Sequence, residues 1–148
     1  MEYKIIVDSR EQKPLFTKDV IVKKLDTGDY SMIVSGVDYK DEFAIEYKTP
    51  VDIIGTLFRG HDRFKRELKR SKSLKFFCIL ISCSYPDLKN KQFKGNEFVK
   101  GNTNTIIKIL ETLIVKYGIK IIFCENRVQS KIRIKGLIEA YLRTYGEK

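Results

Sequence analysis

Carboxylates and a lysine occur early in this sequence at spacings suited to metal-assisted phosphodiester hydrolysis. Glu46 and Lys48 flank one residue in an apolar run, so a strand would point both side chains to the same face. Asp29 follows Gly28 at the start of a second such run, and Asp8 ends the first. Carboxylates hold hard cations such as Mg²⁺, and a lysine stabilises charge developing on phosphate. The pattern predicts an active site; the alternative is solvated strand-end charges.

The elements that must position these residues indicate an α/β fold. Strand-like apolar runs occupy residues 3–7, 20–25, 30–34, 43–48, 76–81 and 119–124. Helical periodicity begins after Pro50, is interrupted at Gly60, and returns at 106–117 and 134–141. We expect an antiparallel beginning, then alternating strands and helices, giving a mixed central sheet with helices on both faces. At 148 residues the chain fits one domain spanning 1–148.

Positive charge is concentrated directly after the carboxylates. The net charge of +10 favours a polyanionic partner, and residues 59–75 hold eight positive against two negative side chains. If Gly60 leaves the helical register intact, one arginine stripe forms, with Lys69 in a second row beside it. The stripe consists of Arg59, Arg63, Arg66 and Arg70. We predict that it contacts DNA phosphates; the alternative is a solvated helix face.

Residues 84–102 show no periodicity and interleave lysines with Tyr85, Phe93 and Phe98. Two interpretations stay open for this segment. It could clamp single-stranded DNA by stacking bases on the aromatic rings. It could equally be a mobile loop whose aromatic side chains pack on the core.

The remaining sequence features point to a cytoplasmic protein. No apolar run approaches the ~18 residues of a membrane span, and the first residues resemble no signal peptide. The odd number of cysteines, three, lies within apolar runs, which is typical of reduced core residues rather than of disulfides or a zinc site. We expect no membrane association.

Four segments, in order, resemble the XPF-type structure-specific endonucleases. Residues 6–11 (IVDSRE) are similar to the opening motif of that family, and residues 28–30 (GDY) to its Gly-Asp element. Residues 46–52 (EYKTPVD) are similar to its Glu-Arg-Lys-x-x-x-Asp motif, and residues 63–68 (RFKREL) to the basic helix that follows. The likeness is clear in the first half of the chain; in the second half, only the order of expected strands and helices agrees with the family.

The resemblance implies a restriction-endonuclease-like core and dependence on Mg²⁺ or Mn²⁺. Carried over residue by residue, it makes Asp29 and Glu46 metal ligands and gives Lys48 the positioning of the attacking water and the phosphate. Asp8 and Glu11 would complete the acidic cluster, with Asp8 also near enough to bind metal.

Asp52 is the last acidic position of the family motif. It lies in the first turn of the expected helix, where it would bind the metal or contact the residues that bind it. The alternative is an exposed acidic side chain stabilised by the helix dipole.

Two departures from the family pattern stand out. Tyr47 takes the place of the middle arginine, although on a strand it would point away from Glu46. The tandem helix-hairpin-helix module common in the family does not follow within the 148 residues, so further DNA affinity would have to come from a partner. The resemblance also implies pairing through the nuclease domain, hence a possible homodimer.

The expected function is therefore metal-dependent endonucleolytic cleavage of DNA, at branched or flap structures. One alternative is a non-catalytic DNA-binding or partner-docking module of the same fold. Another is a junction resolvase or restriction-like nuclease on the same core.

Overall fold

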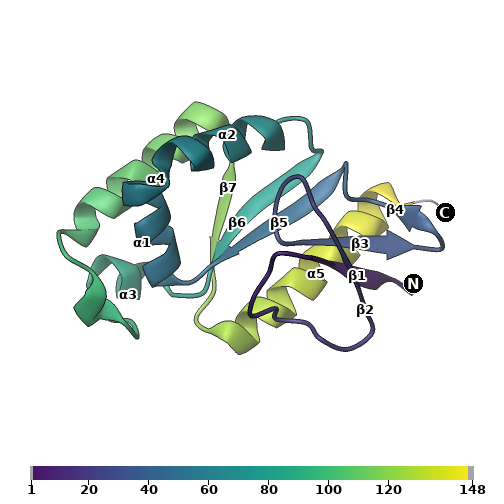
Figure 1. Cartoon of the computed structure of the whole chain (residues 1–148), viewed down its shortest axis with the longest axis horizontal. Helices are drawn as coiled ribbons and strands as arrows, with labels where there is room; N and C mark the ends of the chain where they lie inside the picture. Colours follow the sequence, from purple (N-terminus) through teal and green to yellow (C-terminus); the bar gives the residue numbers. More distant parts are fainter. Residues whose placement is uncertain (1, 147–148) are drawn as a thin grey trace.

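A computed structural model of the chain describes residues 2–146, and a seven-stranded mixed sheet forms its centre (Figure 1). The strand order is β2-β1-β3-β5-β6-β7, and the short β4 pairs with β3. The strands are β1 (Lys4–Asp8), β2 (Val20–Lys23), β3 (Tyr30–Val34), β4 (Val37–Asp38), β5 (Phe43–Lys48), β6 (Phe76–Ile81) and β7 (Lys120–Phe123). The helical segments are α1 (Pro50–Arg59), α2 (His61–Ser71), α3 (Tyr85–Lys89), the 3-10 turn η1 (Asn96–Phe98), α4 (Thr103–Tyr117) and α5 (Arg127–Tyr145).

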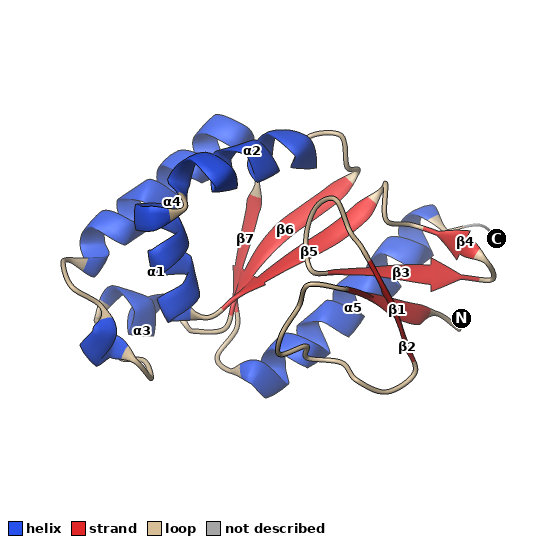
Figure 2. Cartoon of the chain, viewed as in Figure 1, coloured by secondary structure: helices blue, strands red, loops and turns tan. Residues whose placement is uncertain are grey.

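The helices form a layer on each face of the sheet, as Figure 2 shows. One core cluster joins α1, α2 and α4 to Ala44, Ile79 and Ile81 of the sheet. The other joins α5 to the opposite face, through residues that include Phe43 and Ile45. The period-two alternation of β5 explains this division and places Glu46 and Lys48 on the side of Ala44, facing α1 and α2. The predicted mixed sheet covered on both faces is confirmed.

The sheet consists of two parts that meet between β3 and β5. β3 pairs antiparallel with both β1 and β4, whereas β5, β6 and β7 run parallel. β3 and β5 share one paired position, Tyr30 with Ile45. The expected antiparallel beginning is wrong in one respect, because β1 pairs with β2 in parallel. Residues 9–19 between these two strands form a crossover long enough for the chain to return to the same end.

Helix ends in the first half follow local chemistry. The Thr49 side chain accepts the Asp52 backbone N–H, Pro50 opens α1, and its fixed φ suits the first turn. Gly60 lies between α1 and α2, and its N–H donates to the Thr56 carbonyl. The predicted interruption at Gly60 is thus a real change of helix, and the two helices carry their side chains in separate registers.

The segment 84–102 is not an unstructured loop, because it contains α3 and η1. The Ser84 side chain accepts the Asp87 backbone N–H and thereby caps α3. Phe93 packs against the first core cluster, whereas Phe98 is 78% exposed. The Tyr85 ring makes a T-shaped contact with that of Phe123, although Tyr85 is 42% exposed. Of the three aromatic side chains, Phe93 alone thus packs on the core as the second interpretation predicts. In the part of the chain described, no helix has the length and apolarity that a membrane crossing requires.

Candidate active site

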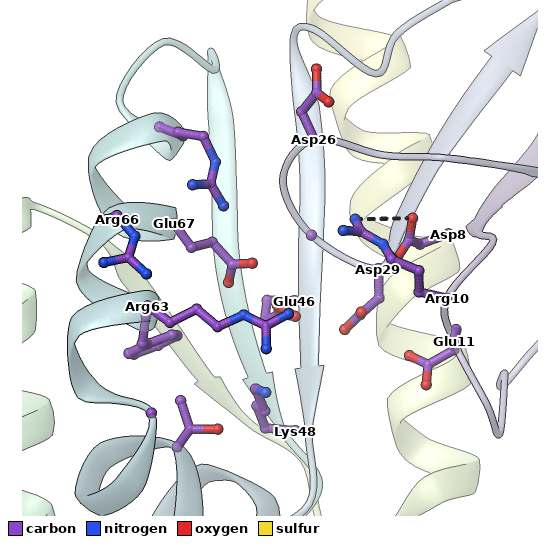
Figure 3. A pocket seen from close by; sticks show the side chains of 15 residues that line it. Asp8, Arg10, Glu11, Asp26, Asp29, Glu46, Lys48, Arg63, Arg66 and Glu67 are labelled. Carbon is purple, nitrogen blue, oxygen red and sulfur yellow. Dashed lines mark hydrogen bonds and ion pairs between the residues drawn. The ribbon is translucent and has the colours of Figure 1, made fainter.

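A cleft of about 600 Å³ lies over β5, between α2 and the turn that follows β1 (Figure 3). Its acidic lining comes from the sheet, the turns and α2, and its basic lining mainly from α2. The acidic residues are Asp8, Glu11, Asp26, Asp29, Glu46 and Glu67. The basic residues are Arg10, Lys48, Arg63, Arg66 and Arg70. The five residues predicted to act in catalysis, Asp8, Glu11, Asp29, Glu46 and Lys48, therefore line one cavity.

Three hydrogen bonds hold Asp29 between β1 and β5. Its N–H donates to the Ile45 carbonyl at 2.8 Å, and its own carbonyl accepts the Asp8 N–H at 2.9 Å. The Tyr47 backbone N–H donates to Asp29 Oδ2 at 2.7 Å. Asp29 thus bridges the exit of β1 and the middle of β5, which brings its carboxylate beside that of Glu46.

Gly28 makes this close approach possible. Its φ is +81°, in the left-handed region, and a Cβ there would lie 2.8 Å from Ala44 Cβ and 3.2 Å from the Ile45 carbonyl oxygen. Any side chain would therefore push the 26–29 turn away from β5 and carry Asp29 with it.

Gly28→Ala is expected to destabilise the fold by about 2–5 kcal/mol, the sum of the left-handed backbone cost and overpacking against β5. Gly36→Ala is the matched control, since Gly36 has φ +78° but a Cβ at this position would meet no atom within 4 Å. That variant bears only the backbone cost, about 1–2 kcal/mol. Urea unfolding of both measures the difference, and equal losses would contradict the contact argument.

Burial and like charge act together on the two central carboxylates. Glu46 is 6% exposed, and burial raises its pKa well above the ordinary value; Asp29 and Glu67 raise it further, against the lowering effect of Lys48. Burial also raises the pKa of half-buried Asp29, opposed by hydrogen bonds with the Glu46 side chain and the Tyr47 N–H. The arrangement concentrates negative charge at a buried point with one adjacent ammonium.

Glu67 and Asp26 line the cleft although sequence reasoning did not assign them to it. Helical spacing held a signal for Glu67, because it lies four residues after Arg63 and three before Arg70, on the same face of α2. No comparable signal marks Asp26, which lies in the turn before Gly28. Figure 3 shows Arg63 reaching from α2 toward Glu46, with Glu67 beside it.

Asp8 is engaged in structure at the edge of the cleft. Its Oδ1 accepts the Leu25 backbone N–H at 2.9 Å, and its carboxylate pairs with Arg10 at 3.1 Å. Arg10 also donates to the Leu25 carbonyl at 2.6 Å. The 6%-exposed Asp8 thus ties the end of β1 to the segment leading into Gly28. Glu11 lies beyond it on the rim, with its backbone N–H bonded to the Asp8 carbonyl.

Several predicted site residues lie outside the cleft lining. Asp52 is exposed in the first turn of α1, and its backbone N–H is capped by Thr49. Arg59 ends α1, so the helix change at Gly60 separates it from the arginines of α2, and Lys69 is exposed on α2 away from the cavity. The four-arginine stripe is therefore wrong at its first member. Within residues 2–146, no three carboxylate, histidine or cysteine side chains are gathered closely enough to form a metal cluster.

Tyr47 contributes to the site through its backbone. Its side chain packs against the cluster on the α5 face, opposite Glu46 and Lys48, as strand alternation requires. Its N–H is the donor that holds Asp29. Substitution of the side chain at this position leaves that donor in place.

Comparisons with known proteins agree with this geometry. The family model described as "ERCC4 domain" matches residues 7–135. Among solved structures, XPF from Aeropyrum pernix has a TM-score of 0.70 at 23% identity, covering 98% of this chain and 64% of that one. XPF from Aeropyrum pernix in complex with DNA has a TM-score of 0.69 at 20% identity, covering 99% and 68%. The chain thus spans under two thirds of the first structure, and no curated protein matches it in sequence.

Proposed function

The chain belongs to the ERCC4 domain family of XPF-type nucleases, which includes structure-specific DNA endonucleases, and on this premise we propose that it is a metal-dependent DNA endonuclease. Its substrates would be branched or flap DNA inside the cell, and the reaction would be hydrolysis of a phosphodiester bond. One observation supports this most strongly: buried Glu46 lies with Asp29 and Lys48 at the floor of a cleft to which α2 contributes three arginines.

The donor set fits Mg²⁺ or Mn²⁺. Asp29 and Glu46 offer hard oxygen ligands, and the charge of Asp29 raises the pKa of buried Glu46, which is the condition that a divalent cation relieves. Mg²⁺ often needs only one or two carboxylates, because water and substrate phosphate complete its shell. The bound ion would supply Lewis-acid stabilisation of the charge developing on the phosphate. Asp8, already bonded to Leu25 and Arg10, would support these ligands rather than replace them.

The side chains of the chain itself would orient the reacting groups. Lys48, on the same face of β5 as Glu46, would place its ammonium beside the phosphate and donate to a nonbridging oxygen or to the attacking water. Arg63 and Arg66 would bind the flanking phosphates from α2, while Glu67 would keep Arg63 aligned across the cleft. The XPF from Aeropyrum pernix that was solved in complex with DNA supports the same class of ligand for this chain.

Cleavage of a panel of DNA structures tests the proposal. Labelled flap, fork, four-way junction and linear duplex DNA would be incubated with the purified protein, with Mg²⁺ and with a chelator. We expect cleavage only with the metal, and faster on branched than on linear DNA. Cleavage of four-way junctions alone would indicate a resolvase, and binding without cleavage of any member would indicate a non-catalytic DNA-binding module.

A further inference from the structure

A second basic cavity, of about 230 Å³, lies next to the end of α2 that is distal from the catalytic carboxylates. It forms where α2 and α4 end and β6 and β7 begin. These element ends lie along the upper edge of the sheet in Figure 1. Its lining contains three lysines and no carboxylate: Lys72, Lys75 and Lys120, with Tyr117 at its side. We define these three lysines together with neighbouring Lys116 as the distal lysine patch.

Aromatic rings hold these lysines without neutralising them. Lys72 and Lys116 each lie 5.5 Å from the centroid of the Tyr117 ring. Lys75 lies 3.7 Å from that of Tyr145, and Lys120 lies 5.3 Å from that of Phe76.

All four lysines are exposed, and none forms an ion pair with any carboxylate in residues 2–146. Glu42 lies beside this patch, because its backbone carbonyl accepts the Phe76 N–H. Its carboxylate accepts the Tyr141 hydroxyl and forms no ion pair with these lysines. Ammonium groups already restrained in this way lose less side-chain entropy when they bind phosphate.

The two cavities follow one helix. Arg63, Arg66 and Arg70 line the catalytic cleft along α2, Ser71 lines the second cavity, and Lys72 follows it. From Arg63 to Lys72 the chain advances nine residues, or about 14 Å along the helix axis. Phosphates on one DNA strand advance about 3.4 Å per nucleotide along the duplex axis, so this distance corresponds to roughly four nucleotides.

We propose that the distal lysine patch binds the sugar-phosphate backbone of the duplex arm that leaves the catalytic cleft, about four to five nucleotides from the cleaved bond. The inference rests on the proposed nuclease function and adds to it the path of the substrate. The observations favour duplex DNA as the ligand, because the positive charge of the distal lysine patch continues that of the arginines on α2. A row of lysines suits the phosphates of a DNA backbone, which are contacted without reading the base sequence.

Salt-dependent binding of the inactive Glu46→Gln protein to flap DNA tests the proposal without requiring cleavage. Lys72→Gln/Lys75→Gln is compared with Lys131→Gln/Lys135→Gln. The second pair lies on α5, on the other face of the sheet, with both lysines exposed and within 5.8 Å of the Phe16 ring centroid. Charge change and type of aromatic contact are therefore matched, and circular dichroism checks that each variant folds.

The distal pair should weaken binding at least about tenfold near 0.1 M salt and reduce the slope of log K against log salt by about 1.8, whereas the control pair should change neither. Equal behaviour of the two pairs overturns the proposal. A neutral methylphosphonate can replace one phosphate about four nucleotides from the cut bond. It should weaken DNA binding by the Glu46→Gln protein that retains Lys72 and Lys75, but should weaken binding little further when both lysines are replaced by Gln. If the panel shows no cleavage while the distal pair still weakens binding, the nuclease proposal fails and the binding surface stands.

Discussion

Replacing Glu46 with Gln is expected to abolish DNA cleavage while making the metal-free protein more stable. The substitution keeps the size of the side chain but removes the charge that would hold the divalent ion. Metal-ion stabilisation of the developing charge is worth several kcal/mol, so its loss should slow cleavage by about 10³-fold or more. Single-turnover cleavage of flap DNA in Mg²⁺ measures this effect.

The stability gain follows from the same buried carboxylate. Burial and the charges of Asp29 and Glu67 raise the pKa of Glu46 in the folded state, so ionisation favours the unfolded chain. This contribution to stability is complete below the ordinary glutamate pKa, about 4.3, and is lost as pH rises through the raised folded value. The stability advantage of the Glu46→Gln variant over the wild type should therefore be near zero in acid and should grow as pH rises, which thermal melts would record as a higher Tm of the variant at alkaline pH.

Divalent cations separate the two effects. In chelator, the Glu46→Gln protein should melt above the wild type at alkaline pH. Added Mg²⁺ or Mn²⁺ should raise the Tm of the wild type and leave that of the variant nearly unchanged, because binding to the folded state alone stabilises it. A variant that cleaves as fast as the wild type would contradict the site assignment, and an unchanged wild-type Tm would contradict the metal assignment.

Lys48→Met should reduce the rate of cleavage by about 10² to 10³-fold without loss of the fold, as removal of one charge-stabilising donor does in other hydrolytic sites. Methionine preserves an unbranched side chain in the half-buried position at the end of β5 but carries no ammonium. The loss should fall on the rate at saturating DNA more than on the affinity, because Lys48 would act on charge that develops during the reaction.

Tyr47→Phe is the control for this prediction, on the adjacent residue of the same strand. Its side chain packs on the opposite face, and the backbone N–H that holds Asp29 is unchanged by substitution. Cleavage by Tyr47→Phe should equal that of the wild type. If both variants lose activity alike, a general disturbance of β5 would be the cause; if neither does, Lys48 has no part in the reaction.

The main strands, the helix change at Gly60 and the family could be predicted because each depends on local sequence. Alternation in 43–48 places Glu46 and Lys48 together, and the ordered motifs give the XPF-type family, which the family match confirms. The parallel pairing of β1 with β2 could not be predicted, because strand direction depends on where the crossover lies in space. α3 was missed because five residues are too few to show a helical period.

The parts of the candidate site that the sequence did not predict also depend on contacts between elements distant in the chain. Asp8 and Asp29 both end or begin a strand in the sequence, but only the fold shows that Asp8 accepts the Leu25 backbone N–H, in addition to its local pair with Arg10. Arg59 seemed continuous with Arg63 at helical spacing, yet the change of helix axis at Gly60 separates them. The spacing of residues within one helix or strand predicted which side chains lie on the same face. Which of these faces come together to form the site depends on the packing of separate helices and strands, which the spacing does not reveal.

The junction between β3 and β5, with its single paired position, has a consequence for the order of folding. Strands β1 to β4 are close in sequence, as are β5 to β7 with their helices, so each part can gather its own contacts early. Asp29 belongs to the first part, whereas Glu46 and Lys48 belong to the second. The three residues therefore come together only after the two parts of the sheet have paired. Repulsion between the carboxylates of Asp29 and Glu46 opposes this pairing until a cation or a proton binds between them.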